Sequence, residues 1–208
     1  MRLVRPILPI LVCAVATFAS AIREFDLRTT ERLGNELIRV SQRADGGATS
    51  PVRKRAKQTA VSALEGRLYN KVHYEYVVLD DPDGSGFLVY ALATNKTPSQ
   101  QITGGHFRVS ISADGRKAER VDALSHGIIT ERPAMPTGSI QVFIATSQLV
   151  SNIPVETFIY SSYVYRLPIS VATPDGRVWV VGNGMILRVD DKDPGTAADI
   201  LNKKKPRR

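Results

Sequence analysis

Cysteine is almost absent from this sequence. The single cysteine, Cys13, lies in an apolar stretch near the N-terminus, so a chain that has lost this stretch contains none. Such a chain has no disulfide, no thiol nucleophile and no cysteine metal site. The common enzyme signatures are missing as well, since the sequence holds no GxSxG, HExxH, Walker or GxGxxG motif. These absences argue against most hydrolase, zinc-peptidase and nucleotide-binding chemistry.

A long apolar run is also lacking. The apolar residues 7–18 are too few to span a bilayer comfortably; Arg2 and Arg5 precede them and the small residues 19–21 follow. This order is typical of a secretory signal peptide. We therefore predict a signal peptide over 1–21, cleavage after Ala21, and a periplasmic or secreted location. A retained membrane anchor and lipidation of Cys13 are the alternatives.

The net charge of +8 is concentrated in short segments. Without them the chain carries fewer basic than acidic residues, so its basicity is local. Such clusters attract anionic components of the cell envelope, whereas the absence of an aromatic platform argues against nucleic acid. We predict polyanion contacts at Arg53, Lys54, Arg55 and Lys57 in the first cluster and at Lys203, Lys204, Lys205, Arg207 and Arg208 in the C-terminal tail.

Helical periodicity covers the first part of the chain after the signal segment. Leu33, Leu37 and Val40 recur at helical spacing, which predicts an amphipathic helix over 26–44. The glycine pair at 46 and 47 ends it, and Ser50 followed by Pro51 is a start signal for a second helix reaching about Tyr69. Residues 26–69 are therefore predicted to be helical.

From His73 to Val189 the pattern changes to that of strands. Four turn sequences, "DPDGSG", "ADGR", "PDGR" and "GNG", each separate two strand-like runs, as expected for hairpin loops that need positive φ angles. Residues 140–145 are predicted to form a further strand. The aromatic and β-branched segment 155–167 favours a strand, with a short helix before Pro168 as the alternative.

We therefore predict an α+β fold, with N-terminal helices followed by a mainly antiparallel sheet built from consecutive hairpins. One domain covers 22–195, with a helical part over 26–69 and a β-rich part over 73–189. The basic tail, 196–208, is expected to be disordered on composition alone.

The turn after residue 80 has a pattern that resembles part of a calcium loop. Asp81, Asp83 and Ser85 occupy the first, third and fifth positions of an EF-hand loop, but Leu92 stands where the bidentate glutamate belongs. A polar hairpin turn is the favoured interpretation, with calcium as the weaker candidate. We predict no other metal site and no cofactor.

The stretch "GGHFRVSISADGR" contains one of three histidines. Alternation along the strand places His106 and Arg108 on the face opposite Phe107. A three-residue loop with a glycine bulge would pair Arg108 with Asp122 and would align Phe107 with Ala123. His106, Arg108 and Asp122 are therefore predicted to share a polar sheet face, which is either a solvated face or a recognition surface.

The segments "GGHFRVSISADGR" and "IPVETFIYSSYVYRLPISVATPDGRVWVVGNG" resemble a group of uncharacterised secreted proteins of proteobacteria. The resemblance covers about half of the chain and implies an envelope location with no assigned activity. Together with the absent motifs, it suggests a non-enzymatic binding or structural module of the cell envelope. The alternatives are an inhibitor or chaperone-like protein that binds partners along a sheet edge, and a metal-dependent hydrolase using His73, His106 and nearby carboxylates.

Overall fold

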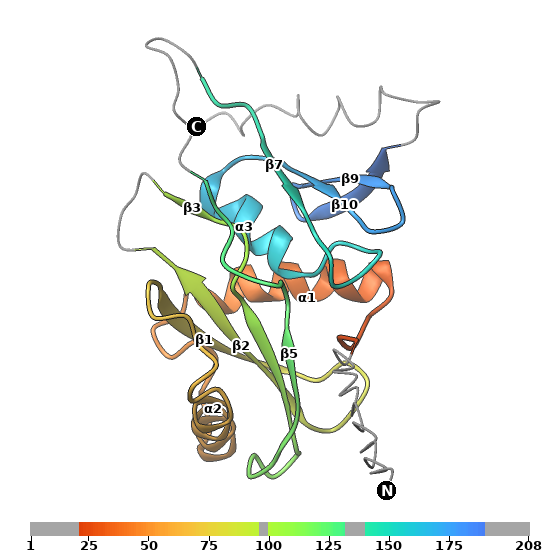
Figure 1. Ribbon diagram of the computed structural model, residues 1–208. Coiled ribbons are helices and arrows are strands. Elements are labelled where there is room, and N and C mark those ends of the chain that lie inside the picture. Colours follow the sequence, from red (N-terminus) through yellow and green to blue (C-terminus); the bar gives the residue numbers. More distant parts are fainter. Residues whose placement is uncertain (1–20, 96–99, 132–139, 190–208) are drawn as a thin grey trace, which may run out of the picture.

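The chain has an α+β fold in which two helices precede the strands, as predicted (Figure 1). The computed structural model describes residues 21–95, 100–131 and 140–189. The predicted signal peptide, apart from Ala21, and the basic tail with its five cations lie outside these residues. None of the helices in the described part has the length and apolar character needed to cross a bilayer.

Helix α1, Leu27–Ser41, confirms the first predicted helix with slightly narrower bounds. Its start is fixed by Asp26, whose Oδ1 accepts a hydrogen bond of 2.7 Å from the amide of Thr29. Leu33, Leu37 and Val40 are buried, as their spacing predicts.

Helix α2, Pro51–Ala63, begins at the predicted Ser50 cap, whose hydroxyl accepts from the amide of Arg53 at 3.3 Å. It ends at Ala63 and not near Tyr69. Ala56 and Ala60 form its buried face and let the helix approach the sheet closely.

The N-terminal sheet has the strand order β1-β2-β4-β5, and every neighbouring pair is antiparallel. The predicted hairpins across "DPDGSG" and "ADGR" join β1 to β2 and β4 to β5. The strands are β1 His73–Asp80, β2 Phe87–Thr94, β4 Phe107–Ile111 and β5 Ala118–Ala123. Two short strands, β3 Gln101–Ile102 and β6 Thr130–Glu131, form a separate ladder.

The remaining strands form a second, C-terminal sheet of order β10-β9-β8-β7. The predicted "PDGR" and "GNG" hairpins are confirmed, whereas β7 and β8 are parallel. The strand predicted for 140–145 begins only at Ile144. The strands are β7 Ile144–Ser147, β8 Ile169–Ala172, β9 Val178–Gly182 and β10 Met185–Val189.

The strand favoured for 155–167 is wrong, because this segment contains helix α3, Thr157–Tyr165. Parallel strands need a crossover connection, and a helix packed on the sheet provides it. The six residues 157–162 are all buried, so no polar face marks a helical period in the sequence. Gly34 of α1 lets α3 approach, since a Cβ at this position would lie 2.6 Å from Cβ of Ile159.

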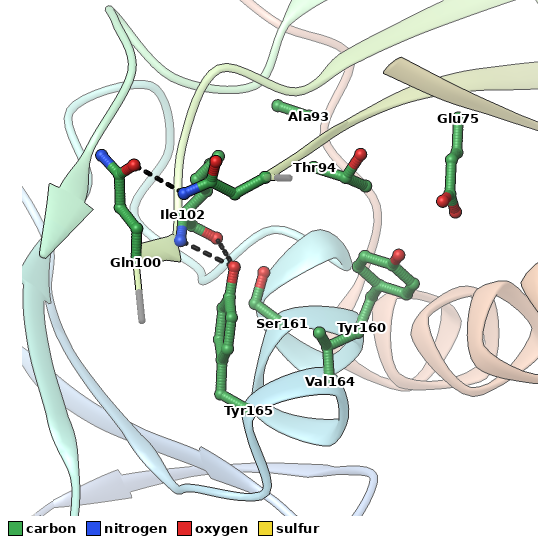
Figure 2. Close-up of a pocket in the computed structure, with 10 residues that line it drawn as sticks. Glu75, Ala93, Thr94, Gln100, Ile102, Tyr160, Ser161, Val164 and Tyr165 are labelled. Atoms are coloured by element: carbon green, nitrogen blue, oxygen red, sulfur yellow. Dashed lines mark hydrogen bonds between the residues drawn. The ribbon is translucent and has the colours of Figure 1, made fainter. Parts of the chain in front are cut away.

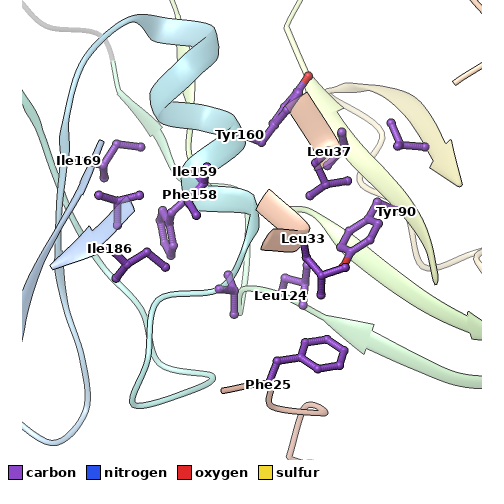
Figure 3. Close-up of a cluster of buried hydrophobic side chains, with 14 of the residues drawn as sticks. Phe25, Leu33, Leu37, Tyr90, Leu124, Phe158, Ile159, Tyr160, Ile169 and Ile186 are labelled. Carbon is purple, nitrogen blue, oxygen red and sulfur yellow. The ribbon is translucent and has the colours of Figure 1, made fainter. Parts of the chain in front are cut away.

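The main core fills the space between the two sheets (Figure 3). Leu33 and Leu37 of α1 meet Phe158 and Ile159 of α3 there, and both sheets add side chains such as Tyr90 and Ile169. A second core lies between the other face of the N-terminal sheet and α2. The layers are therefore C-terminal sheet, α1 with α3, N-terminal sheet and α2 (Figure 1).

Candidate functional site

The register predicted for the "ADGR" hairpin is confirmed. Arg108 pairs with Asp122 and Phe107 with Ala123, with an irregularity between Ser110 and Ile111. The expectation of a solvated polar face or recognition surface is wrong, however. His106, Arg108 and Asp122 are 2%, 1% and 3% exposed, because α1, α3 and residues 22–25 cover this face of the sheet.

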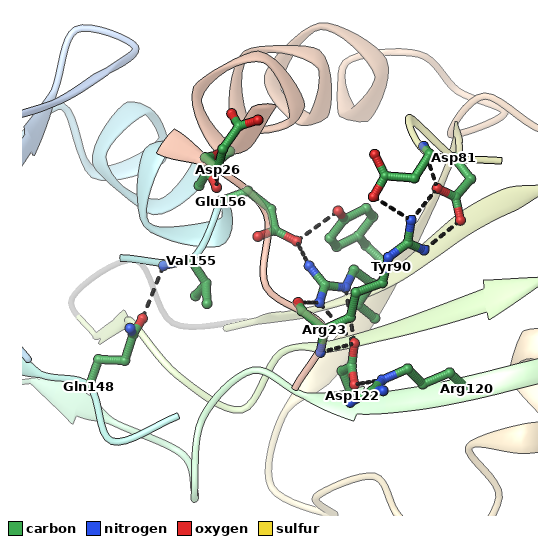
Figure 4. Close-up of polar contacts among 12 residues, drawn as sticks. Arg23, Asp26, Asp81, Tyr90, Arg120, Asp122, Gln148, Val155 and Glu156 are labelled. Carbon is green, nitrogen blue, oxygen red and sulfur yellow. Dashed lines mark hydrogen bonds and ion pairs between the residues drawn. The ribbon is translucent and has the colours of Figure 1, made fainter. Parts of the chain in front are cut away.

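Arg108 is the centre of a buried ion-pair network. Figure 4 shows Glu156, Asp122 and Tyr90 of this network. The Arg108 guanidinium donates to Oε1 of Glu156 at 2.6 Å and to Oδ2 of Asp122 at 2.8 Å, and it also donates to the carbonyl of Arg23. Tyr90 Oη donates to the same Glu156 oxygen at 2.7 Å. Since buried charges need partners on every side, this network is structural and ties β4, β5 and the start of α3 together.

The electrostatics of the network keep Arg108 positively charged and Tyr90 neutral, which are the protonation states that their hydrogen bonds require. Burial alone acts to lower the pKa of Arg108, but Glu156 and the other partners outweigh it and hold that pKa above its ordinary value. Burial and the Glu156 charge raise the pKa of Tyr90, so its hydroxyl stays a donor. Neither group is placed to exchange protons near neutral pH.

His106 takes part in this interior through one ring nitrogen. Its Nδ1 accepts a hydrogen bond of 3.0 Å from the amide of Ala93, while Nε2 has no partner among the described residues. Burial lowers the pKa of His106 to about 4, so the ring is neutral at pH 7. His73 and His126 are exposed, and the histidines predicted for the hydrolase alternative therefore lie in different environments.

Asp81 and Asp83, the two aspartates of the predicted calcium site, form ion pairs with Arg23. Arg23 donates to both oxygens of Asp81, at 2.6 and 2.7 Å, and to Oδ2 of Asp83 at 2.9 Å. Ser85 is exposed. Within the described ranges, no group of three or more histidine, cysteine or acidic side chains is placed to hold a metal ion. The turn therefore fastens the N-terminal segment to the sheet.

The basic cluster of α2 is largely engaged inside the molecule. Arg53 donates to Asp80 and to the carbonyl of Val78, and Arg55 donates to the carbonyl of Asp114 at 2.9 Å. Lys57 lies over the ring of Tyr76, and Lys54 is exposed. Polyanion binding by this cluster stays a prediction, and three of its four cations have intramolecular contacts.

The outer edge of β7 has a different character. The amides of Ile144 and Gln148 donate to carbonyls on the β8 side, at 2.9 Å each. Because backbone groups alternate along a strand, those of Ala145 and Ser147 lie on the other edge. No backbone hydrogen bond from another described segment reaches them. This edge is therefore open within the described part of the chain.

Large apolar side chains flank the open edge. Val142, Phe143 and Leu149 are 65%, 47% and 62% exposed, and Ile140 is 83% exposed. The whole stretch 140–149 contains no charged residue. This site has no signature in the sequence, because the residues at 140–145 predict a strand and no local signal distinguishes an open edge from a covered one.

Comparison with known proteins adds no relative. No family model, no curated protein and no solved structure matches this chain. The function of the chain is therefore inferred from its sites alone.

Proposed function

We propose that this protein is a non-enzymatic binding module of the periplasm or of the secreted fraction, which adds an extended segment of a partner protein to the outer edge of β7. The observation that carries the proposal is the open edge at Ala145 and Ser147, flanked by exposed apolar side chains. Of the functions considered from the sequence, recognition along a sheet edge fits this geometry best.

The chemistry of the edge defines the partner. Unpaired backbone donors and acceptors bind any extended chain, and side-chain contacts then select the sequence. Here the available contacts are those of Val142, Phe143 and Leu149, so the partner segment is extended and apolar on the side that faces them. Without charges on 140–149, its binding should depend little on salt.

The N-terminal sequence supports the proposed location, since residues 1–21 have the composition of a signal peptide. An affinity for anionic envelope components would be a separate property, carried by Lys54 and by the cations at 203–208. The two modes differ in one respect that is easily measured, because contacts made by cations weaken steeply with salt.

The test is affinity capture from an envelope fraction with wild-type protein and the Ala145→Pro variant. Proline at 145 removes the outward amide hydrogen and keeps the pairing with β8, because proline is tolerated on the solvent side of an edge strand. We expect an unchanged melting temperature, and a partner that is retained by wild type at about 1 M NaCl, where the Debye length is about 3 Å, but is lost by the variant.

Thr146→Pro is the matched control. Its amide lies on the β8 side, so we expect this variant to lose stability, by about 3 kcal/mol, in contrast to its neighbour. A partner that binds Ala145→Pro as well as wild type contradicts edge recognition. If that partner is also released by salt or by deletion of 203–208, the anionic mode is the correct one.

A further inference from the structure

A pocket with a volume of about 360 Å³ opens between the N-terminal sheet and α3 (Figure 2). Its walls come from the first half of β1, the end of β2, strand β3 and residues 160–165 of α3, so it shares no residue with the β7 edge. This volume is within the range of sites that bind small molecules. The described residues that line it are Glu75, Ala93, Thr94, Asn95, Gln100, Ile102, Tyr160, Ser161, Val164 and Tyr165.

One charge dominates this pocket. Glu75 is the only ionised residue among the described lining residues, and its carboxylate has no ion-pair or hydrogen-bond partner in the described part of the chain. It points toward the ring of Tyr160 (Figure 2). Burial, with a contribution from the Glu75 charge, raises the pKa of Tyr160, so the phenol stays neutral. A carboxylate and a neutral aromatic ring thus face the same space.

The opposite wall is polar but uncharged. Ser161 is 1% exposed and its hydroxyl points into the pocket (Figure 2). Tyr165 Oη is held by Ile102, accepting from its amide at 2.6 Å and donating to its carbonyl at 3.1 Å. Gln100 accepts from Asn95 at 2.6 Å. This wall therefore presents hydrogen-bonding groups that are held by contacts within the chain.

We propose that the pocket binds a small organic cation with an ammonium group at Glu75 and Tyr160 and a hydroxyl group directed toward Ser161. An ammonium group gains from both the carboxylate and the face of an aromatic ring. An anion would meet the Glu75 carboxylate, and no cation is among the described lining residues, so the described lining favours a cation over an anion. This selectivity is opposite to that of the basic clusters elsewhere in the chain.

The test compares choline with 3,3-dimethylbutan-1-ol, which has the same shape but a carbon atom in place of the charged nitrogen. Calorimetric or NMR titration of the full mature protein should give an affinity for choline at least about tenfold higher than for the neutral alcohol. Glu75→Gln keeps the size of the side chain and removes its charge, so this preference should disappear. The measured ratio corresponds to about 1.4 kcal/mol for each factor of ten.

Glu119→Gln is the matched control. Glu119 is also an exposed glutamate on an edge strand of the N-terminal sheet, but it lies on β5, away from the pocket. The Glu119→Gln substitution should leave the affinity for choline unchanged. Val164→Trp, which places a larger side chain in the lining, should weaken the binding of both choline and the neutral alcohol. Equal binding of choline and its neutral analogue, equal binding by Glu75→Gln and wild type, or no saturable binding of choline would overturn the proposal.

Discussion

Two edge strands of this molecule, β1 and β7, present the same backbone chemistry and differ in what covers them. At β1 the amide of Val78 donates to the carbonyl of Gly46 at 2.8 Å, and Arg53 donates to the carbonyl of Val78 at 3.1 Å. At β7 no described segment supplies such partners. An open edge invites pairing with another chain, and natural proteins usually cover or charge it. This difference, within the described part of the chain, is the basis for proposing partner binding at β7 and not at β1.

The faces of the two sheets differ as well. The N-terminal sheet buries Arg108, Asp122 and His106 against the main core, whereas the C-terminal sheet presents Ile169, Val171 and Val181 to it. Buried charges and an unprotonated histidine make the first sheet sensitive to single substitutions and to pH. The second sheet depends on apolar packing, which is more tolerant of both.

Removing the central cation of the N-terminal sheet should have the largest effect. Arg108→Met leaves the carboxylates of Asp122 and Glu156 buried without their main partner, which should lower the free energy of unfolding by about 3–5 kcal/mol. Chemical denaturation measures it. Arg177→Met is the control, because the Arg177–Asp175 pair is largely exposed and its loss should cost less than about 1 kcal/mol. Equal effects of the two variants would contradict the structural role of the network.

Acidification should reveal the second difference. Above about pH 6.5 His106 is neutral in both the folded and the unfolded chain, so it has no effect on stability. Between that pH and its folded pKa of about 4, only the unfolded chain takes up the proton. The free energy of unfolding should therefore decrease as the pH is lowered from about 6.5 to about 4, by about 3 kcal/mol in total.

The variant His106→Asn isolates this contribution, since an amide oxygen can still accept from Ala93 and does not titrate. Denaturation curves recorded from about pH 4 to about pH 7 should show a shallower pH dependence for the variant. If the two slopes agree, His106 is not the group responsible.

Substitution of Gly46, which covers the edge of β1, should have the smallest effect on stability. Gly46 has φ +57°, and a Cβ at this position would collide with the carbonyl oxygen of Tyr76 on β1. Gly46→Ala should therefore lower stability by about 2 kcal/mol. Gly66 has φ +73° with nothing within 4 Å of its Cβ position, so Gly66→Ala should show the backbone strain alone, about 1 kcal/mol. Thermal denaturation of both variants measures the difference, and equal losses would mean that Gly46 is not needed for edge contact.

Much of the local structure could be predicted from the sequence. The Ser50 cap, the four hairpins and the register of Arg108 against Asp122 follow from short-range rules of capping, turn geometry and alternation. The helix over 157–165 was only the alternative to a strand, because its residues 157–162 are all buried and leave no polar face to mark a helical period. The β7 edge and the pocket at Glu75 could not be predicted, since each depends on neighbours distant in sequence.

Short-range patterns specify α1, the start of α2 and the four hairpins, because each of these depends on residues a few positions apart. Packing between distant elements specifies which polar residues are buried and which strand edge is left unpaired within the described part of the chain. The face of His106 and Arg108 has the alternation of a solvated sheet, yet α1, α3 and the segment beginning at Ala21 cover it. Burial depends on packing between elements far apart in the chain, and strand periodicity specifies a face without specifying what covers it.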